Sequence, residues 1–459
     1  MARSRRRVRG AGAPAGQAVT ITIVNAEIDG RPGHGLRARD DRIVEVGADV
    51  TPSPGDHVID ARGGALIPGL HDHHVHLRAL AAARASVDVS PAAVVDRDGF
   101  ARALRDAAAR SERDAWVRAV GYHESIAGAL DAAALDAIVG DALVRVQHRS
   151  GALWVLSSAA VRATGADQPD GRLWRRDGWL REHTPPVDVD LPAVGAAAAA
   201  LGITGFTDAD PQRTTADLAT LGVLPQRVMA MGPVGLRPAA DTLVTVGPVK
   251  VLLDDDALPA LSQLVALVTA AHAEDRGVAV HCVTRAQLVL TIAALTEAGP
   301  SGSDRVEHGS VIPAELVDDL RRLAVTVVTQ PSFVAERGDA YARDVEAADL
   351  DDLYRAATLV RQGVALAAGS DAPYASLDPW GAMRAASTRT LGVHERLSPD
   401  RALALFTGRA DRPAGARTLT PGEPADLVVL AAPRAQALAD PDASLVCATI
   451  ARGHPTFLR

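Results

Sequence analysis

The feature that most limits the fold of this chain is an alternation of short β-branched runs and helical patterns that starts at Gly202. Seven runs follow one another, at 203–207, 227–231, 249–253, 278–282, 305–307, 325–329 and 364–368, and the apolar segment 65–70 supplies an eighth. Between the later runs, apolar residues recur at helical spacing at 258–275, 285–298, 313–323 and 350–362. Alternating β/α units build a parallel sheet, and eight of them close into a barrel. We therefore predict an α/β fold with a (β/α)8 TIM-like barrel.

The segment 77–201 does not follow this repeat, so we expect it to be a long insertion after the first barrel strand that covers the site. Its own patterns predict a helix at 100–112, strands at 116–120 and 143–147, and a hairpin at 172–181.

Both ends of the chain carry short strand-like runs, at 19–28, 35–46 and 58–59 and again at 425–430 and 445–451. The terminal runs are too few to fold alone, and we predict that the two ends share one sheet. The predicted domains are an Arg-rich disordered tail (1–17), a composite β-sandwich (18–64 with 412–459) and the barrel (65–411) with its insertion.

Charge and cysteine content exclude several functions. The 48 basic and 56 acidic residues give a net charge of -8, which does not suit a nucleic-acid partner. The two cysteines form no CxxC pair, so we expect neither a disulfide scaffold nor a thiolate zinc site. We also expect a cytoplasmic protein, because few cysteines are typical of a reducing compartment. The longest apolar stretch is short of the roughly 18 residues of a membrane span. We expect a small-molecule substrate; the oligomeric state stays open, with a homodimer as one option.

Histidines cluster after the first predicted strand, where residues 71–76 read His-Asp-His-His-Val-His. In an extended chain, residues two apart share a face, so His74 and His76 can point together into the barrel mouth and bind one cation. Taken alone, a histidine pair in a loop is weak evidence for a metal site.

Further metal-ligand residue types stand at the ends of other predicted strands. Lys250 ends the fourth strand, His281 ends the fifth, His308 follows the sixth and Asp371 follows the eighth. All would lie at the carboxyl end of the barrel, where barrel enzymes build their sites. Lys250 is the only lysine among 48 basic residues. An amine can lose its proton when buried and act as a nucleophile, whereas guanidinium cannot, so we expect Lys250 to have a chemical role.

With these motifs, and with Pro68-Gly69-x-x-Asp72-x-His74-x-His76, Gly121-Tyr122, Glu307-His308 and Gly369-Ser370-Asp371, the chain resembles the amidohydrolase superfamily. Within it, the chain is similar to the amidohydrolase 3 family, whose members resemble N-substituted formamide deformylases. The resemblance implies that His74, His76 and Asp371 bind one divalent metal and that His281 and His308 bind a second. Lys250, carboxylated on its amine, would bridge them. Zinc suits these ligands best, with manganese, iron or nickel open, and one ion or two.

From these residues we predict an enzyme that hydrolyses a non-peptide C–N amide bond in a small molecule. Metal-activated water would attack the bond, and Asp371 would act as general base and acid. The alternatives are a ring deaminase or a lactone or ester hydrolase on the same barrel, and a non-catalytic assembly protein. Candidate substrate contacts lie near strand ends or in the insertion: Tyr122, His123, His148, Arg149, Trp154, Glu182, Asp208, Arg285, Gln330 and Tyr374.

Overall fold

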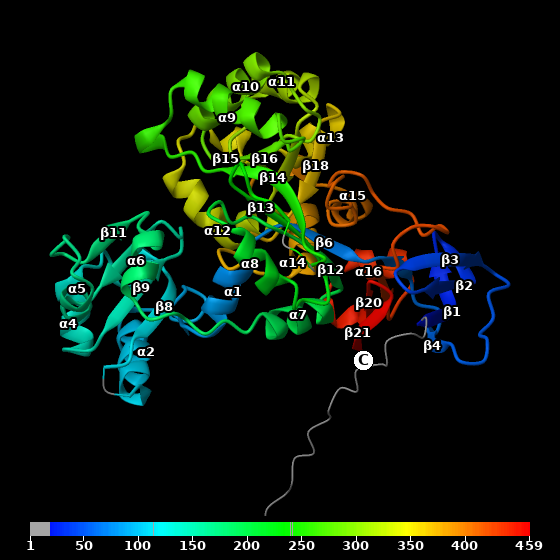
Figure 1. Cartoon of the computed structure of the whole chain (residues 1–459), viewed down its shortest axis with the longest axis horizontal. Helices are drawn as coiled ribbons and strands as arrows, with labels where there is room; N and C mark the ends of the chain where they lie inside the picture. Colours follow the sequence, from blue (N-terminus) through cyan, green and yellow to red (C-terminus); the bar gives the residue numbers. More distant parts are fainter. Residues whose placement is uncertain (1–18, 113, 239, 241) are drawn as a thin grey trace, which may run out of the picture.

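The computed structural model describes residues 19–112, 114–238, 240 and 242–459. Figure 1 shows a central barrel with the insertion on one side, in cyan, and the sheets of the two chain ends on the other, in blue and red. The predicted tail, 1–17, lies outside the described residues.

The centre of the molecule is the predicted (β/α)8 barrel, an eight-stranded parallel sheet in the order β18-β17-β16-β15-β14-β13-β12-β6. Its strands are β6 (Leu70–Val75), β12 (Ile203–Asp208), β13 (Arg227–Gly232), β14 (Thr245–Val251), β15 (Val278–Cys282), β16 (Arg305–His308), β17 (Thr326–Thr329) and β18 (Ala365–Ala368). Within the described part of the chain no ladder pairs β18 with β6. The barrel is nearly closed there, because the backbone N–H of Asp371 donates to the carbonyl of His74 at 2.7 Å.

The first barrel strand is β6 and not the predicted segment 65–70, which was wrong. Residues of that segment form β5 (Leu66–Pro68), which pairs antiparallel with β19 (Leu427–Leu430) of another sheet. The chain changes sheets at Gly69, where a Cβ atom would lie only 2.3 Å from Thr204 Oγ1. As a result, the histidines at 71–74 lie inside the first strand rather than after it.

Helices surround the barrel strands and bury their outer faces. In one buried cluster, Leu288 and Leu295 of a helix join four strand valines: Val249, Val251, Val278 and Val280. The helices are α1 (Leu77–Arg84), α7 (Leu191–Ala200), α8 (Thr215–Leu221), α9 (Leu261–His272), α10 (Arg285–Ala298), α11 (Val317–Arg322), α12 (Pro331–Asp344), α13 (Ala356–Arg361), α14 (Pro379–Thr388) and α15 (Pro399–Ala404). Short 3-10 turns precede or join them at η1 (Asp255–Ala257), η2 (Ala314–Leu316), η3 (Leu350–Asp352) and η4 (Val393–Glu395).

The insertion folds around its own five-stranded sheet, in the order β11-β10-β9-β8-β7. Its elements are β7 (Val87–Asp88), α2 (Arg97–Arg110), β8 (Val117–Tyr122), α3 (Glu124–Ala127), α4 (Ala132–Val139), β9 (Val144–His148), β10 (Leu153–Leu156), α5 (Ser158–Thr164), β11 (Arg172–Trp174) and α6 (Asp177–His183). The predicted hairpin at 172–181 was wrong, because only its first three residues are a strand. Trp154 Nε1 donates to Asp177 at 2.8 Å, which fixes the start of the helix that follows.

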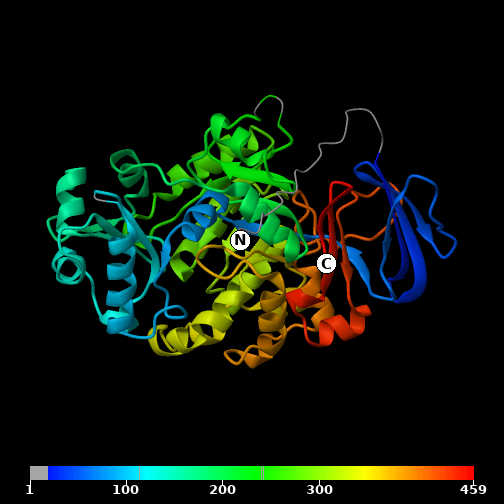
Figure 2. The ribbon, with the colours of Figure 1, turned by 90° about the horizontal axis from the view of Figure 1, so that it is seen from below.

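The two chain ends form two four-stranded sheets rather than the one shared sheet that we predicted. One contains β1 (Thr20–Ile28), β2 (Arg31–Arg39), β3 (Arg42–Gly47) and β4 (His57–Asp60); the other contains β5, β19, β20 (Val446–Ala451) and β21 (His454–Leu458), with α16 (Arg434–Ala439) and η5 (Ala443–Leu445) between β19 and β20. Both edges of β1 are occupied by β2 and β4, so the C-terminal strands pair with β5 instead. The sheets share one apolar core, in which Ile21 and Ile23 cluster with Leu427 and Ile450, and Figure 2 shows them facing each other.

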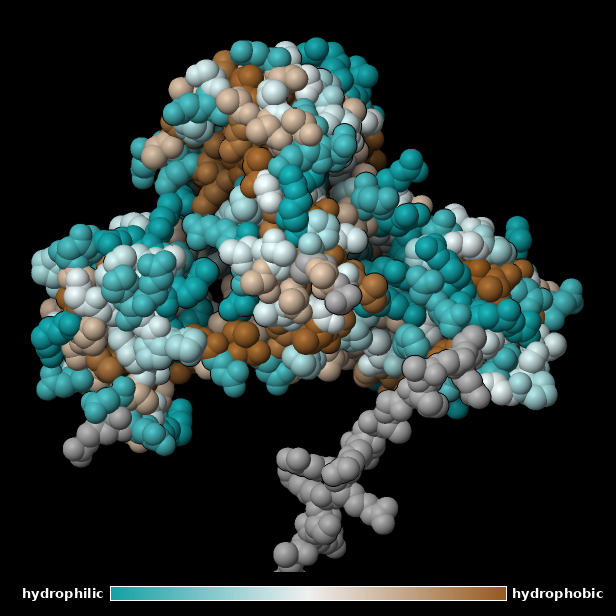
Figure 3. All heavy atoms as spheres, in the orientation of Figure 1, coloured by the Kyte–Doolittle hydropathy of each residue, from teal (hydrophilic) through white to brown (hydrophobic). Residues whose placement is uncertain are grey.

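The surface is largely hydrophilic over the insertion and the chain-end sheets on the face drawn in Figure 3. Over the described residues, no helix combines the length and the apolar character that crossing a membrane requires.

Candidate metal centre

The six predicted ligand residues lie at the carboxyl end of the barrel. His74 belongs to β6, Lys250 to β14 and His281 to β15, whereas His308 is the last residue of β16. His76 comes directly after β6, and Asp371 follows β18 by three residues. Because parallel strands end at the same rim, these side chains meet in one mouth.

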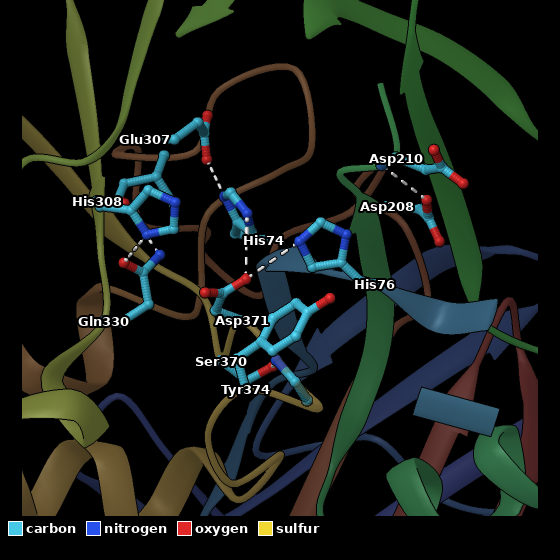
Figure 4. Close-up of polar contacts among 12 residues, drawn as sticks. His74, His76, Asp208, Asp210, Glu307, His308, Gln330, Ser370, Asp371 and Tyr374 are labelled. Carbon is cyan, nitrogen blue, oxygen red and sulfur yellow. Dashed lines mark hydrogen bonds and ion pairs between the residues drawn. The ribbon is translucent and has the colours of Figure 1, made fainter. Parts of the chain in front are cut away.

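Asp371 and two imidazoles form the tightest group at this mouth (Figure 4). Asp371 Oδ1 lies 3.5 Å from Nε2 of His74 and 3.2 Å from Nε2 of His76. One donor atom from each of the three residues lies within 4.8 Å of the others. Ligand atoms about 2.0 Å from one zinc ion stand a little over 3 Å apart in tetrahedral geometry, so the group is close to that arrangement.

His308 and His281 continue the cluster on the other side of His74. The ring centroid of His308 lies 4.8 Å from that of His74 and 4.5 Å from that of His281. Lys250 is buried, and its charge acts on the pKa values of all three histidines. The ring contacts therefore bring the two predicted ligand groups together, and Lys250 is buried on β14, which pairs with the strand that carries His281.

Among the described residues, three buried atoms of the predicted ligands have no hydrogen-bond partner: Nε2 of His74, Oδ1 of Asp371 and Nζ of Lys250. Buried polar atoms almost always have partners in folded proteins, so three unpartnered atoms in one cluster are informative. A cation would satisfy His74 and Asp371, and a carbamate on Lys250 would replace its amine with carboxylate oxygens that a cation can bind. The residues present therefore fit a divalent metal.

The ionisation states of the buried histidines and of Lys250 also fit a divalent metal. Burial, with the nearby charge of Lys250, lowers the pKa of His281 to about 3. Burial likewise holds the pKa values of His74 and His308 well below the ordinary value. The imidazoles are therefore neutral, as metal ligands must be. Burial also lowers the pKa of Lys250, which favours the neutral amine that can take up carbon dioxide.

Residues behind the histidines orient their rings. His74 Nδ1 donates to Glu307, which also accepts from Arg305 Nε at 2.7 Å. His308 Nδ1 donates to Gln330 Oε1 at 2.8 Å. Both contacts place the ring proton on Nδ1 and leave Nε2 free for a metal. Gln330, predicted as a substrate contact, therefore holds His308, and Glu307 was missed as a site residue although it is a charge inside a barrel strand.

The loop after β18 is held against β6 by a second buried carboxylate. Asp72 accepts from the backbone N–H of Ser370 at 2.9 Å and from its hydroxyl at 2.5 Å. A Cβ atom on Gly369 would lie 2.3 Å from the backbone nitrogen of His74, so only glycine permits this approach. The pairing brings Asp371 to the histidines of β6.

Glu307→Gln is expected to weaken metal binding by about 10- to 100-fold, because the amide no longer polarises the ring of His74. The measurement is a competition titration of the metal against a chromophoric chelator. Glu297→Gln, an exposed position on α10, is the matched control and should bind like the unaltered chain. An affinity of Glu307→Gln equal to that control would show that Glu307 does not support the metal ligand.

The other predicted substrate contacts lie in three kinds of place. Tyr374 faces the centre, with its ring edge-on to His76 at 5.5 Å (Figure 4). Two of the others form ion pairs on the barrel: Asp208 pairs with Arg213, and Arg285 pairs with Asp349, Asp352 and Glu315.

The rest lie in the insertion. The hydroxyl of Tyr122 donates to the carbonyl of Gly128, the indole of Trp154 donates to Asp177, and the backbone N–H of Arg149 donates to the carbonyl of Tyr122. His148 pairs with Glu124 beside His123, and Glu182 is exposed.

Arg175 is a residue at the mouth that sequence reasoning missed. It lies in the insertion and forms an ion pair with Asp254, which follows β14. Its charge also lowers the pKa of His281, although burial and the charge of Lys250 have larger effects. No signal in the sequence distinguishes it from the chain's many other arginines. It ties the insertion to the barrel beside the candidate centre.

Comparison with known proteins agrees with this architecture. A metal-dependent hydrolase from Pyrococcus furiosus superposes with a TM-score of 0.69 at 18% identity, over 92% of this chain and 99% of that chain. The zinc complex of atrazine chlorohydrolase TrzN from Arthrobacter aurescens TC1 superposes with a TM-score of 0.56 at 14% identity, over 95% and 94%. These likenesses concern the fold.

Two curated relatives match in sequence. Imidazolonepropionase of Symbiobacterium thermophilum is 52% identical over 52 residues, a match that spans 10% of this chain and only 12% of that protein. The amidohydrolase homologue YtcJ of Bacillus subtilis (strain 168) is 23% identical over 76% of this chain and 77% of that protein. The family model of the Amidohydrolase family, Amidohydro_3, matches residues 57–457. Because this match includes the barrel, the insertion and the C-terminal sheet, the chain belongs to the amidohydrolase family and is a hydrolase.

Proposed function

We propose that this chain is a divalent-metal hydrolase that cleaves a C–N bond other than a peptide bond in a small molecule. The observation that carries the proposal is the buried Oδ1 of Asp371, which has no hydrogen-bond partner among the described residues and lies beside Nε2 of His74 and His76 at the barrel mouth. Membership of the amidohydrolase family supports the same reaction class.

His74, His76 and Asp371 would hold one ion, and His281 with His308 a second, with carboxylated Lys250 between them. Zinc is our choice because imidazole and carboxylate ligands suit it. A bound ion would supply a water of lowered pKa and would polarise a substrate carbonyl. Asp371 would bind the ion through Oδ1, and its second carboxylate oxygen would take up a proton, hold it and pass it to the leaving nitrogen.

An amine is a poor leaving group unless its nitrogen is protonated, so a proton carrier at the centre favours C–N cleavage. The insertion, which Arg175 ties to the barrel beside the centre, would limit the substrate to a small molecule. Ring deamination and lactone or ester hydrolysis need the same donors and are the second candidates, because one barrel fold serves many reactions.

A substrate panel run with metal-reconstituted chain tests the proposal. N-formyl and N-acyl amines, cyclic amides, lactones and aminated heterocycles are incubated with the protein, and acid, amine and ammonia are measured. Acid together with amine, or a ring-opened cyclic amide, is the expected result. Ammonia release from heterocycles would assign a deaminase, acid from lactones alone a lactonase, and tight metal binding without turnover a non-catalytic protein. Chelator-stripped chain is the control and should be inactive.

A further inference from the structure

A second group of metal-ligand side chains lies in the insertion, outside the barrel mouth. His123 comes directly after β8, and His148 ends β9. These strands are neighbours in parallel, with Tyr122 paired to His148 and the backbone N–H of Arg149 donating to Tyr122 O at 2.8 Å. The carboxyl ends of the two strands therefore bring both imidazoles to one edge of the insertion sheet, where Glu124 begins α3.

The three side chains turn toward one another. Glu124 Oε2 lies 3.0 Å from His148 Nε2 and 4.0 Å from His123 Nε2, and the ring centroids of the histidines are 5.8 Å apart. One donor atom of each residue lies within 4.8 Å of the others. Because the Glu124 side chain is 45% exposed, it can move the few tenths of an ångström to one ångström that tetrahedral coordination requires.

Each imidazole is anchored in the same way. Nδ1 of His123 lies 2.8 Å from Ser125 Oγ and 3.3 Å from the Ser125 backbone nitrogen. Nδ1 of His148 lies 2.7 Å from Ser150 Oγ and 3.1 Å from the Ser150 backbone nitrogen. Both rings therefore present Nε2 to Glu124. Because a serine backbone N–H donates to each Nδ1, binding a metal through Nε2 requires the other tautomer, with the ring proton on Nδ1 and the serine hydroxyl as its acceptor.

The proton balance of binding can be written for these atoms. Without an ion, the serine N–H groups donate to Nδ1, and His148 donates its Nε2 proton to Glu124. On binding, the Nε2 proton would move to Nδ1, where the serine hydroxyl can accept it. This shift would free the Nε2 lone pair for the cation and would cost the hydrogen bond from the serine backbone N–H to Nδ1. Burial lowers the pKa values of both histidines. Burial alone would raise the pKa of Glu124, but its hydrogen bonds and the two histidines hold it below the ordinary value. The ligands are thus two neutral imidazoles and one carboxylate.

We propose that His123, Glu124 and His148 bind a divalent cation, preferably zinc, at a site separate from the barrel mouth. Two imidazoles and one carboxylate are a ligand set that zinc accepts, with a fourth position left to solvent. The site also has a link to the mouth. In the turn after His148, Gly151 packs so closely on Tyr374 that a Cβ atom would lie 2.5 Å from Tyr374 Cε1. Tyr374 in turn lies against His76, so an ion on His148 would fix a turn that borders the candidate centre.

Zinc stoichiometry measures the site directly. The full chain, the double variant His123→Gln/His148→Gln and the control His183→Gln are stripped with chelator and dialysed against the same free zinc. Bound zinc per chain is then counted by mass spectrometry. His183 is an exposed histidine of α6 in the same insertion, which makes it a matched control. We expect the double variant to bind one zinc ion fewer than the unaltered chain and the control.

Glu124→Gln keeps the test informative if the double variant does not fold. Glu124 is largely exposed, so this change leaves the fold intact, and we expect zinc affinity at this site to fall by at least about 10-fold. Equal zinc counts in the unaltered chain and the double variant, unchanged affinity in Glu124→Gln, or an equal loss in His183→Gln would overturn the proposal. Because only the difference between variants is used, the result does not depend on what the barrel mouth binds or hydrolyses.

Discussion

Asp371→Asn is expected to lower the hydrolytic rate by at least about 10²-fold, because the amide can neither accept the proton of the attacking water nor pass it to the leaving nitrogen. Asparagine is the right replacement because Asp371 has a positive φ of 56°, a conformation that asparagine adopts far more readily than alanine. The measurement is the rate on the best substrate of the panel together with bound metal per chain. Loss of rate with metal retained would isolate the proton transfer; loss of both would identify Asp371 as a ligand as well.

Asp275→Asn is the matched control for this change. Asp275 has nearly the same backbone conformation, with φ 55°, but it is exposed and precedes β15, at the amino end of the barrel strands. We expect Asp275→Asn to keep the full rate. A rate for Asp371→Asn within about threefold of that control would remove Asp371 from the mechanism, since general acid–base catalysis contributes far more than this.

Lys250→Arg is expected to lose at least one bound metal ion and to abolish activity. Guanidinium keeps its charge at any accessible pH, so it cannot form the carbamate that would join the two ligand groups. It would also leave a buried cation without a partner, because Nζ of Lys250 has no hydrogen-bond partner in the part of the chain that the structure describes. Metal content by mass spectrometry and turnover of the best substrate are the measurements.

The single lysine makes the carbamate itself observable. Incubation with ¹³C-bicarbonate and zinc should give a carbamate carbon signal in the NMR spectrum of the full chain that is missing from Lys250→Arg, because Lys250 is the only lysine side chain and any carbamate on the α-amino group is common to both. Lys250→Ala with added acetate should regain part of the bound metal, since a free carboxylate can occupy the vacated space. Full metal content and activity in Lys250→Arg would exclude the carbamate and leave a one-metal enzyme on His74, His76 and Asp371.

Sequence reasoning reached the architecture where the signal is local. Runs of β-branched residues and apolar residues at helical spacing specify strands and helices through short-range packing, and their alternation predicted the barrel that the structure confirms. The same reasoning failed at 65–70 and 172–181. Leu66–Pro68 is a short apolar strand, whereas Leu70–Val75 is buried although four of its six residues are polar. Only their partners, β19 and β12, decide which sheet each one joins.

In the candidate centre, too, some features follow from local sequence and others only from contacts between distant segments. Chain order alone placed His74, His76, Lys250, His281, His308 and Asp371 at strand ends, because parallel strands in a barrel share one rim. The structure brings the four histidines and Asp371 together, whereas the role of all six residues as ligands stays a prediction. The contacts that orient the rings, from Glu307 to His74 and from Gln330 to His308, join different strands. They depend on register and on closure of the barrel.

The sequence by itself therefore determined the barrel, the rim at which its chemistry lies and the residue types that meet there. Those properties follow from strand periodicity and from chain order. Only the tertiary structure decided that β5 joins the C-terminal sheet, that the chain ends form two sheets, and that His123 and His148 face one carboxylate in the insertion. The physical reason is that pairing between distant segments is selected by free edges and side-chain packing, which no short stretch of sequence contains.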